Sequence, residues 1–167
     1  MADHRSARLA LPFIESGQAQ KEMAHNEALA LLDIAVQAGV QAAGIDQPPA
    51  DPEAGACWIV GPAPVGVWEK QAGCIAGWTG GGWRFVVPRE GAQAWNRAAR
   101  QWLTRVDGIW EEGVVRGSRL VLGGEQVVGA RRPAIAAPSG GAAIDAEARV
   151  AIGAILDAMR AHGLIAS

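Results

Sequence analysis

The side chains best suited to recognising another molecule are the tryptophans, of which this chain has seven in 167 residues. An indole offers a flat apolar face and one N–H donor, so it can stack on a sugar ring, a nucleobase or a partner protein. Trp78 and Trp110 stand beside glycine-containing turns, and with Trp95 they form our candidate for an exposed carbohydrate-binding platform. The alternative is a thin sheet core, in which strand alternation places Trp83 and Phe85 on one face. We expect the core interpretation to hold for most of the seven.

Side chains that could carry catalysis or bind a metal are scattered along the chain. The serines form no G-x-S-x-G motif, and the histidines and cysteines show no metal-ligand spacing. Glycine-rich stretches at 61–66 and 80–82 match no phosphate-binding loop and are expected to be turns. Two carboxylate pairs, at Glu111-Glu112 and at Asp145 and Glu147, fall at a strand end and at a helix start. We therefore predict a protein that is not an enzyme and has no catalytic residue, no metal site and no cofactor.

Charge and cysteine content limit the partners and the compartment. A formal net charge of −2 gives no electrostatic footprint for a nucleic acid or an anionic membrane. The first apolar run is too short for a signal peptide and no run has membrane-spanning length, so synthesis in the cytoplasm is expected. Cys57 and Cys74 lie in apolar strand-like runs. Two buried thiols are expected there, with one disulfide as the alternative.

A helix is expected from about residue 17 to residue 37. Leu29, Leu32 and Val36 fall on one stripe by 3-4 spacing and should be buried, against the sheet or against neighbouring subunits. Asp33 belongs to the polar line on the opposite side. The polar half of the helix is expected to contact a partner chain through Gln18, Gln20, Lys21, His25 and Asn26.

Hydrophobic alternation with a period of two begins near residue 57 and predicts short strands, including 65–70 and 101–106. Turn signals at 79–82, at Asp107-Gly108 and at Gly123-Gly124 predict three hairpins. The chain is thus expected to be α+β, with an N-terminal helix, a small antiparallel Trp-rich β domain (barrel or sandwich) and a C-terminal helix.

Composition divides the chain into five expected segments. These are a helical assembly segment at 1–45, a Pro-rich linker at 46–56, the β domain at 57–128, a loop at 129–144 and a C-terminal helix at 145–165. Within the first segment, residues 2–8 are expected to be a polar, mobile lead. The C-terminal helix should start at an Asp145 N-cap and end before Gly163. Because it is too short to fold alone, we expect it to dock or self-associate through Ile152, Ile155 and Met159.

Several strings also resemble a known family. They are GQAQKEMAHNEALALLD at 17–33, WIVGP at 58–62, a Trp-Gly-Gly-Gly-Trp-Arg-Phe-like segment at 78–85, PREG at 88–91 and the C-terminal stretch at 127–165. The chain resembles an unknown-function family found in alphaproteobacterial prophages and in phage-derived gene transfer agents. Ala92 departs from relatives that often have an aromatic residue after the Arg-Glu-Gly.

The resemblance implies a virion component of the head-spike or tail-fibre type, made in the bacterial cytoplasm. Expected partners are further copies of the chain (a trimer or a pentamer), other virion proteins of the capsid or fibre, and host surface polysaccharide. The leading hypothesis is a structural subunit that oligomerises and supports attachment to the host. A carbohydrate-binding module with exposed tryptophans is the alternative, and a polysaccharide-degrading enzyme is a third possibility.

Overall fold

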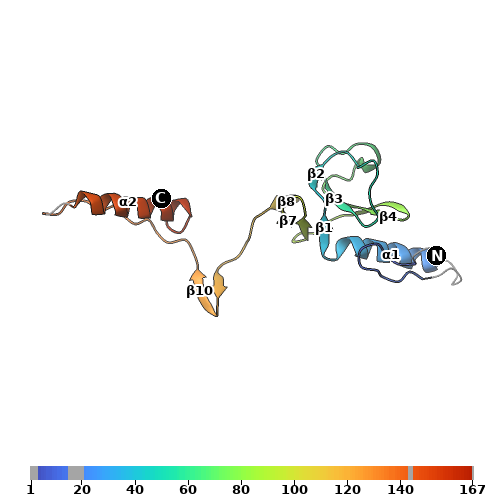
Figure 1. Cartoon of the computed structure of the whole chain (residues 1–167), viewed down its shortest axis with the longest axis horizontal. Coiled ribbons are helices and arrows are strands. Elements are labelled where there is room, and N and C mark those ends of the chain that lie inside the picture. The colour runs from blue at the N-terminus through green and yellow to red at the C-terminus, as the bar shows by residue number, and fades with distance from the viewer. Residues whose placement is uncertain (1–3, 15–20, 143–144, 167) are drawn as a thin grey trace. The chain divides into compact units, whose positions relative to one another are not determined.

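The computed structural model describes residues 4–14, 21–142 and 145–166. The chain divides into two compact units, residues 1–114 and 115–167, called here the first and second unit. Figure 1 labels the elements of both. The expected class is confirmed: one helix lies toward each end of the chain, and an antiparallel-rich β domain lies between them.

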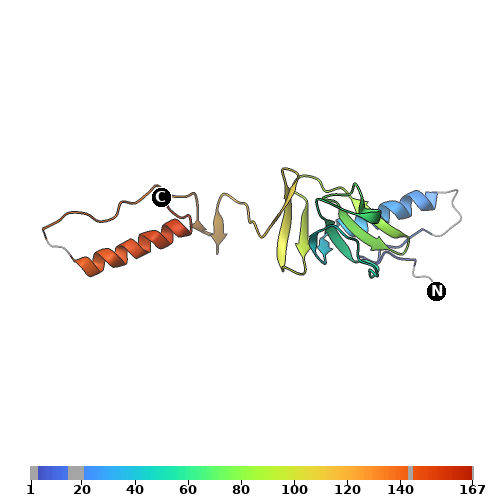
Figure 2. The same ribbon diagram turned by 90° about the horizontal axis from the view of Figure 1, so that it is seen from above.

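Two open four-stranded sheets make up most of the first unit (Figures 1 and 2). Sheet 1 has the strand order β2 (Ala43–Ile45), β3 (Cys57–Val60), β4 (Ile75–Thr79) and β5 (Gly82–Val86). Sheet 2 has the order β1 (Ala38–Val40), β6 (Gln93–Asn96), β7 (Gln101–Val106) and β8 (Ile109–Glu112). The edge pairs β2/β3 and β1/β6 are parallel and the other pairs are antiparallel. The described strands therefore form no closed barrel.

The three hairpins expected from turn chemistry are confirmed. The β4–β5 hairpin turns at Gly80 and Gly81, where Thr79 Oγ1 donates to the Gly82 carbonyl at 2.8 Å. Asp107 and Gly108 join β7 to β8 with φ values of 49° and 75°. Both central residues of a type I′ turn need positive φ, which Asp and Gly tolerate better than most residues.

Strand β3 lies between two apolar clusters, and this explains its unbroken CWIV sequence. Its four residues are all buried. Since neighbouring side chains on a strand point to opposite faces, Cys57 and Ile59 enter one cluster while Trp58 and Val60 enter the other. The first cluster joins sheet 1 to sheet 2, and the second is built around Trp68.

The run at 65–70, expected to be a strand, is a 3₁₀ helix at Gly66–Trp68 (η1). Gly66 has a φ of 62° and Lys70 has a φ of 66°, and both values lie outside the extended region that a regular strand occupies. The turn places Trp68 in the second cluster with no exposed surface. Alternation alone gave no sign of this turn.

Helix α1 (Lys21–Ala35) buries a different stripe from the one expected. Ala30, Asp33 and Ile34 are buried, whereas Leu29 is half-buried and Leu32 and Val36 are 50% and 45% exposed. The buried stripe is set by a close approach to sheet 1. A Cβ atom at Gly77 would lie 2.5 Å from two side-chain atoms of Ile34, so glycine is needed there.

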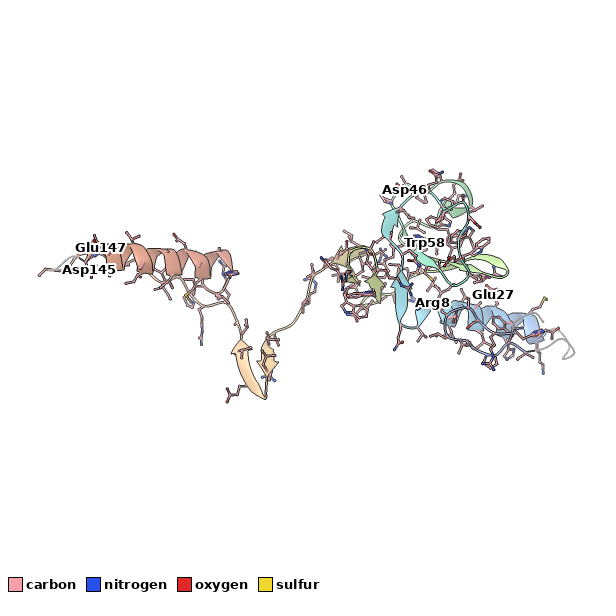
Figure 3. The ribbon with its side chains drawn as sticks, viewed as in Figure 1. Arg8, Glu27, Asp46, Trp58, Asp145 and Glu147 are labelled. Carbon is pink, nitrogen blue, oxygen red and sulfur yellow. The ribbon has the colours of Figure 1, made fainter. Side chains whose placement is uncertain are left out.

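The expectation of a mobile lead is wrong for the described residues 4–8. Asp33, 4% exposed, accepts hydrogen bonds from Ser6 Oγ at 2.7 Å, from the Arg8 N–H at 3.0 Å and from the Leu9 N–H at 2.6 Å. The Arg8 guanidinium donates to the carbonyls of Asp33, Ile34, Val36 and Gln37 at the C-terminal end of α1, where Figure 3 shows it. A cation there satisfies carbonyls that have no partner within the helix.

The second unit contains a hairpin and a helix. Strands β9 (Leu120–Leu122) and β10 (Glu125–Val128) pair antiparallel through Gly123 and Gly124, and every residue of both strands is exposed. Helix α2 (Ala146–Ala161) begins, as expected, at an Asp145 N-cap that accepts from the Ala148 N–H at 2.8 Å. Leu156 is buried on this helix. Ile165, which follows the turn at Gly163, is buried as well.

The structure thus places the strands expected between 57 and 128 in two different units, β3–β8 in the first and β9–β10 in the second. Residues 46–56 carry neither helix nor strand. No helix of the described residues combines the length and the apolar character that a membrane span requires.

Candidate functional site

Four tryptophans form one cluster on sheet 1 and η1. Trp83 lies in edge-to-face contact with Trp58, Trp68 and Trp78, at centroid distances of 5.6, 5.1 and 5.1 Å. Trp68 is fully buried, and its Nε1–H has no hydrogen-bond partner among the described residues. The cluster is therefore a packing element, and Trp78 is its partly exposed end.

Trp95 lies on a second aromatic surface, together with Trp102. The two are direct partners in the β6–β7 register, and their rings meet edge to face at 5.3 Å. Their strand neighbours Ala94 and Leu103 belong to the core, so the two tryptophans point to the opposite face of sheet 2, away from it. Trp102 is 52% exposed.

This outward face of sheet 2 is the exposed aromatic surface of the first unit; we call it the Trp95–Trp102 face. Gly39 adjoins Trp95 in the β1 register, and the next pairs along the face add Gln93, Thr104 and Glu111. Flat aromatic rings flanked by polar side chains are typical of surfaces that bind sugars. Trp102 was not among the residues expected to form a platform. The alternation of Trp102 and Thr104 with apolar Leu103 was the signal that could have indicated it.

Trp110 lies on the inner face of the same sheet. It pairs with Arg105, three residues after Trp102, so strand alternation places it on the side opposite to the Trp95–Trp102 face. Its ring packs against the core, its Nε1–H donates to the Gly73 carbonyl at 2.8 Å, and the Arg105 Cζ lies 5.9 Å from its centroid. The three residues expected to form one platform, Trp78, Trp95 and Trp110, are therefore on three different surfaces.

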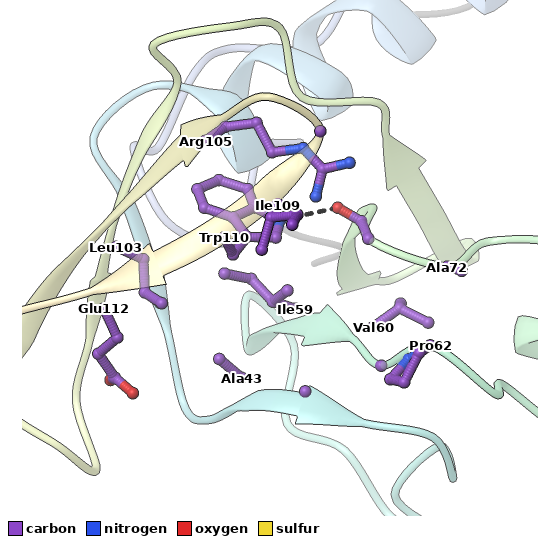
Figure 4. Close-up of a pocket in the computed structure, with 14 residues that line it drawn as sticks. Ala43, Ile59, Val60, Pro62, Ala72, Leu103, Arg105, Ile109, Trp110 and Glu112 are labelled. Atoms are coloured by element: carbon purple, nitrogen blue, oxygen red, sulfur yellow. Dashed lines mark hydrogen bonds between the residues drawn. The ribbon is translucent and has the colours of Figure 1, made fainter.

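A cleft of about 590 Å³ opens where Trp110 and Arg105 face sheet 1 (Figure 4). One wall is the β7–β8 hairpin, with Leu103, Ile109 and Glu112. The other wall comes from β2, from β3 and from the segments around Pro62 and Gly73. Two further hollows border α1: one of about 370 Å³ against β5, and one of about 770 Å³ beside the N-terminal segment.

The polar residues expected to contact a partner chain divide into three groups. Gln18 and Gln20 lie outside the described residues. Lys21 and His25 are exposed, with His25 Nδ1 at 2.8 Å from the Lys21 carbonyl oxygen. Asn26 engages its own chain, since its side-chain amide accepts from the Ile14 N–H at 2.9 Å and donates to the Ile14 carbonyl at 3.0 Å. The contact with a partner chain stays a prediction.

The C-terminal residues expected at the assembly interface are on the surface of α2. Ile152 and Ile155 are exposed and Met159 is half-buried, while Leu156 occupies the buried position between them. Their role in assembly also stays a prediction.

The cysteines are buried thiols, as expected. Neither Cys57 nor Cys74 is in a disulfide. Burial raises the pKa of the Cys57 thiol to about 11, opposed by the positive charge of Arg8, and burial also raises the pKa of Cys74. Both thiols are protonated at neutral pH, and a protonated thiol is a poor nucleophile.

The residues that could serve metal or acid–base chemistry do not converge in the described part of the chain. No group of three or more His, Cys, Asp or Glu side chains is positioned there to hold a metal ion. Glu111 and Glu112 are neighbours on β8 and so point to opposite faces of sheet 2. Glu112 accepts a hydrogen bond from Asn96 Nδ2 at 2.6 Å.

Comparison with known families identifies the first unit. Residues 25–111 match the family described as "Protein of unknown function (DUF2793)", a span that contains all eight strands of sheets 1 and 2 apart from the last residue of β8. The chain belongs to this family. Both the Trp95–Trp102 face and most of the cleft lie within the DUF2793 match, whereas the second unit lies beyond it. No curated protein matches the chain.

Proposed function

We propose that this DUF2793 protein is a non-enzymatic structural component of a phage-like particle, either a gene transfer agent or a prophage. In that role it is the base of a spike or fibre, which oligomerises and supports attachment to the host surface. The resemblance of the strings at 17–33, 58–62 and 78–91 to virion proteins supports the particle, and the exposed apolar surfaces of both units support the oligomer.

The observation that carries the proposal is the number of large apolar side chains left uncovered on helices and strands. On α1, Leu32 is exposed at one side of the 370 Å³ groove, and Val87 is exposed beyond β5 on the other. Val36, directly after the helix, is exposed as well. In the second unit, the β9–β10 hairpin exposes Leu and Val side chains on both faces. On α2 the exposed apolar residues are Val150, Ile152 and Ile155.

Such surfaces have an energetic cost in a monomer. Covering one fully exposed Leu, Ile or Val side chain contributes about 1.5 to 3 kcal/mol. Many such side chains must be covered together to offset an association cost of about 4 to 15 kcal/mol, and both units expose many of them. An isolated two-stranded hairpin is marginal in water. Contact with further copies of the chain would cover the α1 groove, the hairpin and the α2 surface together.

Sedimentation of the purified full-length protein tests the oligomer. We expect a single oligomeric species that dissociates in the Leu32→Gln/Val36→Gln double variant. Val67→Gln is the matched control, because Val67 is equally apolar and exposed but lies on η1. A wild-type protein that stays monomeric at high concentration would remove the oligomeric part of the proposal.

Purified particles test the location. We expect the protein to co-purify with particles at a fixed ratio to the capsid protein, and electron microscopy with a labelled antibody to place it at the surface. Particles that are complete and infective without the protein contradict this part of the proposal.

A second candidate function is binding of host surface carbohydrate, favoured by the Trp95–Trp102 face. Glycan-array binding should be lost in Trp95→Ala and Trp102→Ala. Trp78→Ala is the control, because Trp78 belongs to the packing cluster on the other sheet. Equal binding by wild type and all three variants, or no binding by any of them, removes this candidate.

A further inference from the structure

The cleft between sheet 1 and the β7–β8 hairpin contains a cation without an anionic partner. Arg105 enters it from β7, opposite Trp110. No side chain or backbone carbonyl of the described residues accepts a hydrogen bond from its guanidinium, and none of their carboxylates is within ion-pair distance. By contrast, Arg84 beside α1 is paired with Glu27 at 2.8 Å, and Arg8 is fully engaged with the end of α1.

The backbone around Arg105 is shaped to hold the guanidinium in place. Gly73 has a φ of 74°, and a Cβ atom there would lie 2.9 Å from the Arg105 Nη1. The guanidinium therefore lies directly against the backbone at Gly73, where the positive φ favours glycine. On its other side is the Trp110 ring, with Cζ 5.9 Å from the ring centroid, and the indole N–H is committed to the Gly73 carbonyl. A half-buried guanidinium with its donors unused is well placed to receive an anion.

The remaining lining of the cleft indicates the chemistry of the rest of the ligand, beyond its anionic group. Beside Arg105 the walls are apolar, from Ile59, Pro62 and Ile109. The volume of about 590 Å³ is within the range of small-molecule sites. Trp110 packs against the core and has Arg105 beside it, so a ring stacked on that indole is not the occupant that the geometry favours.

The far end of the cleft limits the charge of the ligand. Glu112 pairs with Leu103, two residues along the hairpin from the Arg105–Trp110 pair and on the same face, so Arg105 and Glu112 are diagonal neighbours with Cα atoms roughly 7 to 8 Å apart. The Glu112 carboxylate would repel a second anionic group on the ligand. The cleft is therefore suited to one negative charge at the Arg105 end, followed by an uncharged body.

We propose that this cleft is a binding site for a monocarboxylate with an apolar body, held by paired hydrogen bonds from Arg105 to the carboxylate. This site is separate from the Trp95–Trp102 face, which lies on the other side of sheet 2, and from the apolar surfaces on which the proposed oligomer depends. A carboxylate is planar and matches the two parallel N–H groups of a guanidinium.

Calorimetric titration of the full-length protein with 3-phenylpropionate tests the site, with 3-phenylpropanol as the matched uncharged probe. We expect saturable binding of the acid and at least about tenfold weaker binding of the alcohol. Arg105→Gln should weaken binding of the acid at least about tenfold. Arg105→Lys should retain only part of the affinity for the acid, since the positive charge stays but the planar guanidinium with its parallel N–H donors is lost. Arg89→Gln, at an exposed arginine outside the cleft, should have no effect.

A second variant keeps the test valid if Arg105→Gln disturbs folding. Ile109 is exposed at the mouth of the cleft, so Ile109→Asp should fold, and it should weaken binding of the acid more than binding of the alcohol. Acetyl-Gly-Phe as free acid and as amide distinguishes the origin of the carboxylate. Tighter binding of the peptide acid than of phenylpropionate points to a chain terminus, and weaker binding points to a small molecule. Absence of saturable binding, or equal binding of acid and alcohol, overturns the proposal.

Discussion

The bonds between the N-terminal segment and α1 lead to a quantitative prediction for Asp33→Ala. The carboxylate accepts three hydrogen bonds, from Ser6 Oγ, the Arg8 N–H and the Leu9 N–H. A hydrogen bond to a charged group contributes about 1.5 to 3 kcal/mol when measured by deletion. Three of them sum to at least roughly 4.5 kcal/mol, but the segment can detach and expose its donors to water, so we expect a loss of roughly 3 to 4 kcal/mol.

Urea unfolding followed by tryptophan fluorescence is the appropriate assay, because all seven tryptophans lie in the first unit and the signal reports on that unit alone. Ser6→Ala removes one of the three donors and should cost about 1 to 2 kcal/mol. In the double variant Ser6→Ala/Asp33→Ala the two losses should not add, since both remove the same bond.

Asp51→Ala supplies the control. Asp51 is an exposed aspartate in the irregular segment before β3, and its replacement should change the free energy of unfolding by less than about 0.5 kcal/mol. If Asp33→Ala costs no more than Asp51→Ala, the carboxylate does not hold the segment and the reasoning is refuted.

Three further predictions concern the packing, the thiols and the second unit. In urea unfolding, Gly77→Ala should destabilise the first unit by about 1 to 3 kcal/mol, because its Cβ would lie 2.5 Å from Ile34 side-chain atoms. Gly80→Ala is the control and should be near neutral, because the space around Gly80 is open. Equal effects of the two variants would contradict the close approach of α1 to sheet 1. The Cys57 pKa is raised from 9.0 to about 11, so the native state keeps a proton that the unfolded state loses, and wild-type stability relative to Cys57→Ala should fall by about 1.4 kcal/mol per pH unit between pH 9 and 11. A flat difference between the two proteins over that interval would exclude the linkage. Asp145→Ala removes the N-cap of α2 and should cost about 1 kcal/mol, seen as lower helical circular dichroism at unchanged tryptophan fluorescence, with Asp157→Ala on the same helix as the control.

Local chemistry accounts for the parts of the fold that could be predicted. Asp107-Gly108 and Gly123-Gly124 occur at hairpin turns because few other residues adopt positive φ in succession, and the Asp145 N-cap depends on a single side-chain bond. These signals lie within a few residues of the structure that they specify. The class of the fold follows from them.

Tertiary contacts explain what could not be predicted. The stripe that α1 buries is set by the gap at Gly77 and by the bonds of Asp33 to a segment about 25 residues earlier, and helical periodicity contains neither piece of information. Charged residues are rarely buried unless they are paired, and the partners of Asp33 cannot be identified from helical periodicity. Asp33 was therefore assigned to the wrong side of the helix. The choice among tryptophans failed for a similar reason. A glycine turn beside Trp78 or Trp110 says nothing about which face of the sheet is covered.

The span of the family match and the span of the folded unit differ, and the difference bears on how the protein should be studied. The match begins at residue 25, yet the C-terminal end of α1 is held by Ser6 and Arg8. A fragment cut at residue 25 would leave Asp33 buried without its donors and the last carbonyls of α1 without Arg8. The physical unit therefore includes the N-terminal segment. The second unit has the opposite property: of its large apolar residues at described positions only Leu156 and Ile165 are buried, Met159 is half-buried, and the others are exposed. A segment with so little core of its own is marginally stable by itself, and this supports the proposed assembly role.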